Sequence, residues 1–485
     1  MILSKRSLSD IPSASVILPQ LVEFELPEKV LQFGTGVLLR GLPDYFINKA
    51  NSKNTFNGRI VVVKSTVKGD LTRFKEQDCL YTICIRGIEN AEVVEKNVVS
   101  SAISRVLDAN ADWDAIIAVA LNPELKFIVS NTTEVGLVLL NEHLTSSAPK
   151  SYPGKLLALL YARFKALGEQ AGELVVIATE LVPDNGKVLQ NIVLELSTYN
   201  SLEDSFVTWV EAKVSFCNSL VDRIVPGTPE KNSLAAIEKD LGYSDDLLIM
   251  AEPYRLWAIE GDQKIVDLLD LDGVDDGLIV KTDIEVFREL KVRLLNGTHT
   301  LACGIAYLAG IDTVADAMSD HALRKYIEEV MQEEIIPAIP YAMTTGEPEA
   351  FAKVVLDRFA NPFIKHQWIN ITFQYTMKLK IRVVPVLKQH YSLSNLVPER
   401  IAFGFAAYLA FSTGKEVAGV GYSVTDDQAG YINGIDKADF VYAVLSDQSL
   451  WGLDLTAFEG FKAAVERYFT YITTNGVVAA LALIR

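Results

Sequence analysis

The stretch from Lys291 to His299 reads KVRLLNGTH and places a lysine, an asparagine and a histidine at positions n, n+5 and n+8. In an α-helix, which turns about 100° per residue, Asn296 lies about 140° and His299 about 80° from Lys291, so all three can face one site. A lysine can transfer protons, an asparagine amide can stabilise an oxyanion, and a histidine can orient a hydroxyl group. The spacing therefore predicts a proton-transfer site on a single helix.

The residues around this triplet help to distinguish a reactive site from an ordinary solvated helix face. Thr282 to Glu285 reads TDIE, a capping-box pattern that predicts the start of the helix. Leucines and valines lie between the polar residues, and the apolar run LACGIAYLAG follows from Leu301. A helix that is apolar nearly all round is buried, and burial lowers the pKa of a lysine. This combination favours a catalytic base over a solvated face.

Two kinds of segment must position this helix. The predicted strands of the first half cover residues 30–34, 59–66, 80–87, 115–121, 126–131 and 174–180. Apolar strands that alternate with helical stretches are typical of a parallel sheet covered on both faces. After about Ile284 the β-rich runs end, and amphipathic helical patterns such as 322–339 and 455–472 follow. We therefore predict an α/β protein, with a doubly wound sheet in residues 1–278, a mainly α-helical domain in residues 279–485, and the active site in the cleft between them.

A glycine-rich turn follows the first predicted strand. It reads FGTGVLLRG, and the helical run LLRGLPDYFINKA overlaps its end. Glycine lets the backbone approach a pyrophosphate, which then lies at the N-terminus of the helix. A GxG pattern alone is a weak signal, but its position between a strand and a helix is the one that dinucleotide binding requires. We expect Gly34, Thr35, Gly36, Val37 and Leu38 to contact such a cofactor.

Polar residues also stand where other strands end, at the edge where parallel sheets bind ligands. The strand RIVVVKST carries Lys64 where an acidic residue usually holds the ribose 2′-hydroxyl of NAD. A lysine there could accept a 2′-phosphate or could be a solvated strand end, so the residues alone leave NADP open. The segment VSNTTEVG contains Ser130, Asn131, Thr132 and Glu134, which could contact the cofactor or simply cap a helix.

Asn185 follows another predicted strand, within TELVPDNG. Its amide is a candidate second donor to an oxyanion, although PDNG is also typical of a plain turn.

The composition of the chain limits the possible classes of partner. The chain has 485 residues, 22% charged residues and a net charge of −17, which indicates a folded protein and disfavours nucleic acid or an anionic membrane as partner.

No signal-peptide core and no membrane-spanning run stand out, so we expect a cytoplasmic protein. The four cysteines show neither zinc-like spacing nor a disulfide framework, and the five histidines are scattered. These observations predict reduced thiols in the core and no metal site.

The motifs resemble those of a known family. KVRLLNGTHT resembles, without a gap, the Lys-x4-Asn-x2-His signature of the polyol-specific long-chain dehydrogenases, the mannitol dehydrogenase family, and FGTGVLLRG resembles that family's nucleotide-binding turn. The chain is most similar to the uronate-reducing branch, through collinear segments that include SNTTEVG, TELVPDNG, FCNSLVDRIVPG, AEPYRLWAIEG and RFANPFIKHQ. The resemblance implies a Rossmann-like domain and metal-free hydride transfer between NAD(H) and a ketone or secondary alcohol.

The resemblance also implies roles for individual residues. Lys291 would be the general acid/base, Asn296 and less directly Asn185 would stabilise the developing alkoxide, and His299 would bind a substrate hydroxyl. The expected substrate is a small hexuronate or aldonate, first of all tagaturonate. Fructuronate or a mannitol-type polyol is the alternative, and a non-catalytic NAD-binding sensor is a reading of another class. Members of the family are often monomeric, so we expect a monomer.

The chain departs from the mannitol-type members at two positions. Asn370 stands where they carry a sugar-binding arginine, which argues against a polyol site of that kind. Lys64 stands where they carry an acidic residue, and this resembles the uronate branch, which uses NAD, so NAD is expected. A uronate carboxylate needs a cation. Lys378 and Arg382, four apart on a predicted helix, and Lys365 are candidates for that clamp, unless KLKIR is a basic surface.

Overall fold

The computed structural model describes residues 1–12, 15–66, 69–132, 136–414, 416–417 and 419–484. The chain divides into two compact units, which we describe separately. Unit 1 comprises Met1–Arg86 and Val93–Ile284, and unit 2 comprises Gly87–Glu92 and Glu285–Arg485. The predicted boundary after residue 278 falls in strand β12 (Leu278–Lys281), a few residues before the division between the units.

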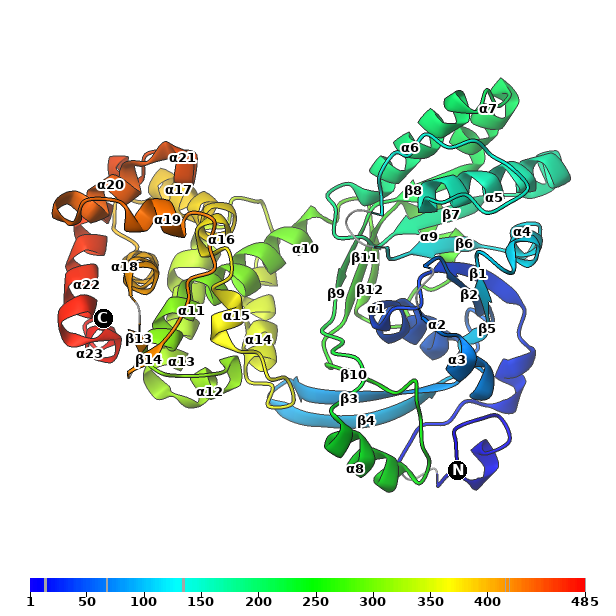
Figure 1. Cartoon of the computed structure of the whole chain (residues 1–485), viewed down its shortest axis with the longest axis horizontal. Helices are drawn as coiled ribbons and strands as arrows, with labels where there is room; N and C mark the ends of the chain where they lie inside the picture. The colour runs from blue at the N-terminus through cyan, green and yellow to red at the C-terminus, as the bar shows by residue number, and fades with distance from the viewer. Residues whose placement is uncertain (13–14, 67–68, 133–135, 415, 418, 485) are drawn as a thin grey trace. The chain divides into compact units, whose positions relative to one another are not determined.

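A six-stranded parallel sheet forms the centre of unit 1 (Figure 1). Its strands are β1 (Glu28–Phe33), β2 (Arg59–Lys64), β5 (Ile103–Asp108), β6 (Phe127–Ser130), β7 (Leu174–Ala178) and β8 (Val214–Cys217). They lie in the order β5-β2-β1-β6-β7-β8, so the order reverses between β1 and β6. This is the strand order of Rossmann folds, which bind ligands at the carboxyl ends of the strands beside that reversal. The predicted doubly wound sheet is confirmed.

Alternating side chains of the strands build two separate apolar layers. Ile60 and Val62 of β2 belong to a layer that also contains side chains of α1 and α2, whereas Val61 and Val63 belong to a layer with α4, α5, α6 and α7. Helices thus cover both faces, as expected for apolar parallel strands. The helices of this unit are α1 (Val37–Gly41), α2 (Pro43–Ser52), α3 (Thr72–Glu76), α4 (Trp113–Ala120), α5 (Tyr152–Leu167), α6 (Asn185–Tyr199), α7 (Asp204–Lys213), α8 (Lys231–Leu241) and α9 (Gln263–Leu269).

Some predicted strands differ from the structure. Residues 115–121 were predicted as a strand, but they lie almost wholly in α4, where Trp113, Ile116 and Ala120 are buried at helical spacing. A short apolar run does not distinguish a strand from a buried helix, and alanine favours the helix. Residues 80–87 do form a strand, β3 (Tyr81–Glu89), but it belongs to a small sheet with β4 (Glu92–Ser100) and β10 (Ile249–Ala251).

A third sheet in unit 1 combines β9 (Ser219–Asp222), β11 (Leu256–Glu260) and β12. The prediction had no counterpart for these strands, nor for β5 and β8 of the main sheet. Strands β8, β9 and β12 have only four residues each, and β5 reads ISRVLD, with polar residues between the apolar ones. Such segments form strands mainly because their neighbours in the sheet pair with them, which a local pattern does not reveal.

Unit 2 is almost entirely helical in its described part, as predicted. Its main elements are α10 (Glu285–Leu290), α11 (Thr298–Leu308), α12 (Val314–Ser319), α13 (His321–Glu329), α14 (Glu347–Phe359), α15 (Trp368–Ile371), α16 (Tyr375–Arg382), α17 (Val384–Leu393), α18 (Glu399–Thr413), α19 (Ala429–Asn433), α20 (Phe440–Ser446), α21 (Gln448–Trp451), α22 (Phe461–Asn475), α23 (Val477–Leu481) and the two-residue strands β13 (Glu416–Val417) and β14 (Val420–Gly421). Helix α18 is buried along most of its length and packs against α11 and α22 (Figure 1). Across the described residues, no helix is both long enough and apolar enough to cross a membrane.

Candidate active site

The triplet Lys291, Asn296 and His299 does not lie on a regular α-helix. A π-helix covers Lys291–Gly297 between α10 and α11. A π-helix bonds residue i to residue i+5, and Lys291 and Asn296 are five residues apart. They therefore lie closer together around the axis than the roughly 140° of an α-helix. The assumption of regular α-helical geometry is wrong here, and the correction brings the lysine and the asparagine nearer to one face. The helix also begins at Glu285 rather than directly after Thr282.

Lys291 and Asn296 are both partly exposed, so the deep burial expected for the lysine is not observed. The backbone carbonyl of Asn296 accepts hydrogen bonds from Thr300 Oγ1 at 2.7 Å and from Arg382 Nη1 at 3.5 Å. The side-chain amide of Asn296, in contrast, makes no hydrogen bond to any residue that the structure describes. The backbone is held in place while the amide is left available to a substrate oxygen.

His299 lies in an aromatic and cationic surrounding and is only 8% exposed. Its ring stacks on Phe359 at a centroid distance of 4.0 Å and makes T-shaped contacts with His366 and Trp368 at centroid distances of 5.2 and 5.8 Å. Within the described part of the chain, His299 Nε2 and Trp368 Nε1 are buried without a hydrogen-bond partner. Burial, and then electrostatic repulsion from His366 and Arg358, lower the pKa of His299 well below its usual value. The imidazole is therefore neutral near pH 7 and has a free position for a polar ligand.

Helix α16 supplies two cations to the same region. Lys378 Nζ donates to the carbonyl of Ile371 at 2.8 Å, and Arg382 Nη1 donates to Thr300 Oγ1 at 3.0 Å. Burial, and then the charge of Arg382, lower the pKa of Lys378, and both cations contribute to the lowered pKa of His299. Since Lys378 and Arg382 are partly buried, they do not form the solvated basic surface that was the alternative.

The other two predicted substrate residues, Lys365 and Asn370, are exposed, and no contact links them to this cluster among the described residues. The prediction missed Arg358, His366 and Trp368, which surround His299. All three lie in or directly after RFANPFIKHQ, a segment already singled out by resemblance. The segment could have pointed to them, but no spacing rule connects it to His299.

In unit 1 the predicted nucleotide turn lies at the end of β1, beside the reversal of strand order. Gly34 has a φ of +131°, and a Cβ there would come within 2.9 Å of Leu39 Cδ1 and 3.1 Å of the carbonyl oxygen of Asn131. Apart from its neighbours in the chain, no described atom lies within 4 Å of where a Cβ at Gly36 would stand. Thr35, Val37 and Leu38 are partly exposed. The turn thus needs glycine at its tight end and leaves open space beside its second glycine, which fits close approach of a pyrophosphate. The helix after it is short, because Pro43 starts a new helix.

Lys64 is neither solvated nor unpaired. It is the last residue of β2, its side chain is 7% exposed, and its Nζ lies 2.7 Å from Oδ2 of Asp108, the last residue of β5. The interpretation of Lys64 as a solvated strand end is therefore wrong. The sequence pattern could not supply its partner, since β5 was not predicted.

The polar residues after β6 form a network with the residues after β7. Ser130 Oγ and Thr132 Oγ1 donate to the carboxylate of Glu180 at 3.2 and 2.9 Å, and Asn131 Nδ2 donates to Thr179 Oγ1 and to its carbonyl oxygen. Burial raises the pKa of Glu180. These contacts fix the edge of the sheet, and a contact with the cofactor stays a prediction. Glu134, also predicted at this edge, lies outside the described residues.

Asn185 is buried, and the backbone uses its whole amide. Its Nδ2 donates to the carbonyls of Glu180 and Ser219, both at 2.9 Å, and its Oδ1 accepts from the amides of Gly186 and Ser219, also at 2.9 Å. An amide side chain has two donor hydrogens and two acceptor positions, so none is left over. This geometry favours a structural role and speaks against the predicted role as donor to an oxyanion.

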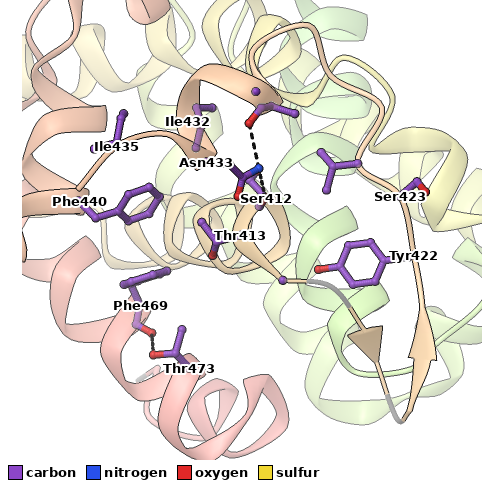
Figure 2. Close-up of a pocket in the computed structure, with 14 residues that line it drawn as sticks. Ser412, Thr413, Tyr422, Ser423, Ile432, Asn433, Ile435, Phe440, Phe469 and Thr473 are labelled. Atoms are coloured by element: carbon purple, nitrogen blue, oxygen red, sulfur yellow. Dashed lines mark hydrogen bonds between the residues drawn. The ribbon is translucent and has the colours of Figure 1, made fainter. Parts of the chain in front are cut away.

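Unit 2 also contains a cavity of a different character, with a volume of about 780 Å³ (Figure 2). It lies at the carboxyl end of α18, between Tyr422, Asn433 and Phe469. The residues that line it are uncharged, and the Lys291 triplet and α16 do not contribute to it. It therefore lacks the proton-transfer groups and cations found around His299. The group of Lys291, Asn296, His299, Lys378 and Arg382 remains the candidate active site.

Comparison with known proteins agrees with the two units. Residues 28–273 match the mannitol dehydrogenase Rossmann domain, and residues 283–473 match the mannitol dehydrogenase C-terminal domain. An altronate oxidoreductase of Halalkalibacterium halodurans is 38% identical over 456 residues, which cover 89% of this chain and 88% of that protein. An altronate oxidoreductase of Bacillus subtilis is 36% identical over 467 residues, which cover 94% of this chain and 95% of that protein.

Two solved structures share the fold at 22% sequence identity. One is D-sorbitol dehydrogenase in its substrate-free form, with a TM-score of 0.80 and coverage of 99% of this chain and 100% of that one. The other is Pseudomonas fluorescens mannitol 2-dehydrogenase in a ternary complex with NAD and D-mannitol, with a TM-score of 0.70 and coverage of 99% of both chains. The signature around Lys291, the strand order and both domain matches lead to one conclusion: this chain belongs to the mannitol dehydrogenase family.

Proposed function

We propose that this chain is an NAD(H)-dependent altronate oxidoreductase, which reduces the keto group of tagaturonate. The observation that carries the proposal is the surrounding of His299, where Arg358, Lys378 and Arg382 all place positive charge. A partly buried group of cations suits an anionic sugar acid and is unnecessary for a neutral polyol. The names of the relatives at 36–38% identity support the same substrate.

The residues of unit 2 divide the chemistry among them. Lys291 donates a proton to the substrate oxygen during reduction and takes it back during oxidation. The Asn296 amide donates a hydrogen bond to the same oxygen and stabilises its developing negative charge. Neutral His299 binds a neighbouring hydroxyl through Nε2, and Lys378 with Arg382 binds the carboxylate.

The glycine turn of unit 1, Gly34 to Leu38, would hold the cofactor. Its open space at Gly36 and its position beside the reversal of strand order fit a dinucleotide. NADH, when bound, supplies the hydride that reduces the ketone carbon. Hydride and proton together convert the ketone to the secondary alcohol, so the reaction balances with no other reactant.

The direct test is the loss of NADH absorbance with tagaturonate, fructuronate and fructose as separate substrates. We expect rapid turnover of tagaturonate alone. A Lys291→Met variant should still bind NADH but lose about 10²–10⁴ in kcat, because general acid catalysis is removed. Turnover of fructose or fructuronate instead would retain the family chemistry and refute the substrate. Binding of NADH without turnover of any of them would favour a sensor.

A further inference from the structure

The carboxyl ends of β2 and β5 carry a buried ion pair. Lys64 and Asp108 are the last residues of adjacent parallel strands and are paired in register. The Nζ–Oδ2 distance is 2.7 Å, and the side chains are 7% and 24% exposed. They lie on the same face of the sheet as Val62 and Val106, which pack in one layer with α1 and α2. The pair therefore stands at the ligand-binding edge, one strand away from the glycine turn after β1.

The Asp108 carboxylate is held firmly in this position. Its Oδ1 accepts hydrogen bonds from the backbone amide and the side-chain amide of Asn110, at 2.9 and 3.2 Å. Its own backbone amide donates to Asp112 Oδ2 at 2.9 Å, which brings a second carboxylate close. The hydrogen bond from Lys64, the foremost cause, and those from Asn110 hold the pKa of Asp108 below its usual value. At neutral pH the charge of Lys64 is cancelled, and these three ionisable side chains together carry one net negative charge.

This charge pattern distinguishes the two nicotinamide cofactors. NAD(H) has a hydroxyl at the 2′ position of the adenosine ribose, and NADP(H) has a phosphate there. A carboxylate accepts a hydrogen bond from a hydroxyl but repels a phosphate. In most Rossmann folds that carboxylate belongs to the second strand, whereas here the second strand ends in a lysine. The neighbouring strand supplies a carboxylate at the same edge.

We propose that Asp108 is the specificity-determining residue for the cofactor: it binds the ribose 2′-hydroxyl, and by neutralising Lys64 it prevents that lysine from attracting a 2′-phosphate. The inference rests on the proposed function only in that this function needs a nicotinamide cofactor. It assigns to β5 the role that β2 has in other Rossmann folds.

The test is the affinity of the purified full chain for NADH and NADPH, measured separately by nicotinamide fluorescence and by calorimetry. Wild type should bind NADH more tightly. Asp108→Asn keeps an acceptor for Lys64 but removes the charge, so the ratio of the two dissociation constants should move toward NADPH by about tenfold or more. Adding Lys64→Met to this variant should abolish the gain in NADPH affinity, because no cation remains for the phosphate.

Two further variants keep the result interpretable. Lys64→Met alone leaves Asp108 unopposed and should retain NADH binding while weakening NADPH binding, which provides a second test if Asp108→Asn folds poorly. Asp270→Asn is the matched control. Asp270 forms an ion pair with Lys126 at 3.1 Å, and because Lys126 directly precedes β6, this pair lies at the opposite end of the strands from Lys64 and Asp108. It should leave the ratio unchanged.

An unchanged ratio in folded Asp108→Asn, or a wild-type chain that binds NADPH as tightly as NADH, would overturn the inference. Turnover of tagaturonate is measured in a separate assay from the cofactor affinities. Turnover by the wild type combined with an unchanged ratio would refute only the role of Asp108. A shifted ratio without turnover would refute only the proposed reaction.

Discussion

Two asparagines, one in each unit, were expected to donate hydrogen bonds to the same substrate oxygen. Asn185 is 2% exposed, and its amide makes four hydrogen bonds to backbone groups. Asn296 is partly exposed, and its amide makes no hydrogen bond within the described residues, although its carbonyl is bound by Thr300 and Arg382. The same residue type thus builds the edge of a sheet in one unit and faces outward from a π-helix in the other.

The difference shows that the hydrogen bonds already made decide what a polar side chain can still do. A buried amide with every position satisfied adds to stability, because removing it leaves several buried backbone groups without partners. An amide without partners adds little to stability and can bind a ligand at once. Loss of Asn185 should therefore affect folding, and loss of Asn296 should affect the reaction.

Asn296→Ala carries the largest expected effect. Removal of one oxyanion donor costs about 10²–10³ in kcat, which corresponds to about 3–4 kcal/mol. Steady-state kinetics with tagaturonate should show this loss, while the melting temperature and the affinity for NADH stay near those of the wild type. Asn395→Ala, at an exposed asparagine of the same unit, is the control. Undiminished turnover in Asn296→Ala would remove this residue from the active site.

Asn185→Ala should show the opposite pattern. It leaves the amides of Gly186 and Ser219 and the carbonyl of Ser219 without this partner, whereas the carbonyl of Glu180 keeps its hydrogen bond from the Val182 amide. We expect a loss of about 3 kcal/mol in the free energy of unfolding. Thermal unfolding measures this loss, and active-site titration gives kcat per folded molecule. If kcat per folded molecule fell as far as in Asn296→Ala while the melting temperature held, the two residues would have the same role and the contrast would fail.

Lys378→Met tests whether the partly buried cations of α16 recognise an anion. Loss of a charge-assisted hydrogen bond to the substrate carboxylate should raise KM for tagaturonate about tenfold or more. KM for NADH should not change. Lys388→Met replaces an exposed lysine on the next helix and serves as the control. Equal KM values for tagaturonate in both variants would move the carboxylate site elsewhere.

The smallest predicted effect is a pH dependence at His299. The pKa of His299 is lowered in the folded chain. Below a pH of about 6.5, His299 therefore takes up a proton in the unfolded chain but stays neutral in the folded chain. Stability should therefore be lost as the pH falls below about 6.5, by up to about 1.4 kcal/mol per pH unit from this residue. His299→Leu should reduce the loss between pH 6.5 and 5.5 in thermal unfolding. Parallel curves for the variant and the wild type would show that His299 is protonated as readily in the fold as outside it.

Much of the fold could be predicted because apolar strands and amphipathic helices have local patterns. The strands at 30–34, 59–66 and 174–180 were recognised for this reason, as was the change to helices after Ile284. The run 115–121 failed because a short apolar segment suits a strand and a buried helix equally well. The π-helix at Lys291–Gly297 could not be predicted either, since π-helices are rare and its residues fit the pattern of a regular α-helix.

The sequence by itself determined the chemistry that is available: a lysine, an asparagine and a histidine at family spacing, a glycine turn between a strand and a helix, and two cations on one helix. Only the tertiary structure decided which of these groups already have partners within the protein and which are left to bind a ligand. Asn185 meets Ser219 across 34 residues, Lys64 meets Asp108 across 44, and the ring of His299 meets Trp368 from another helix. Hydrogen bonds and ion pairs act over a few ångströms in space, whereas a sequence pattern reports only neighbours along the chain.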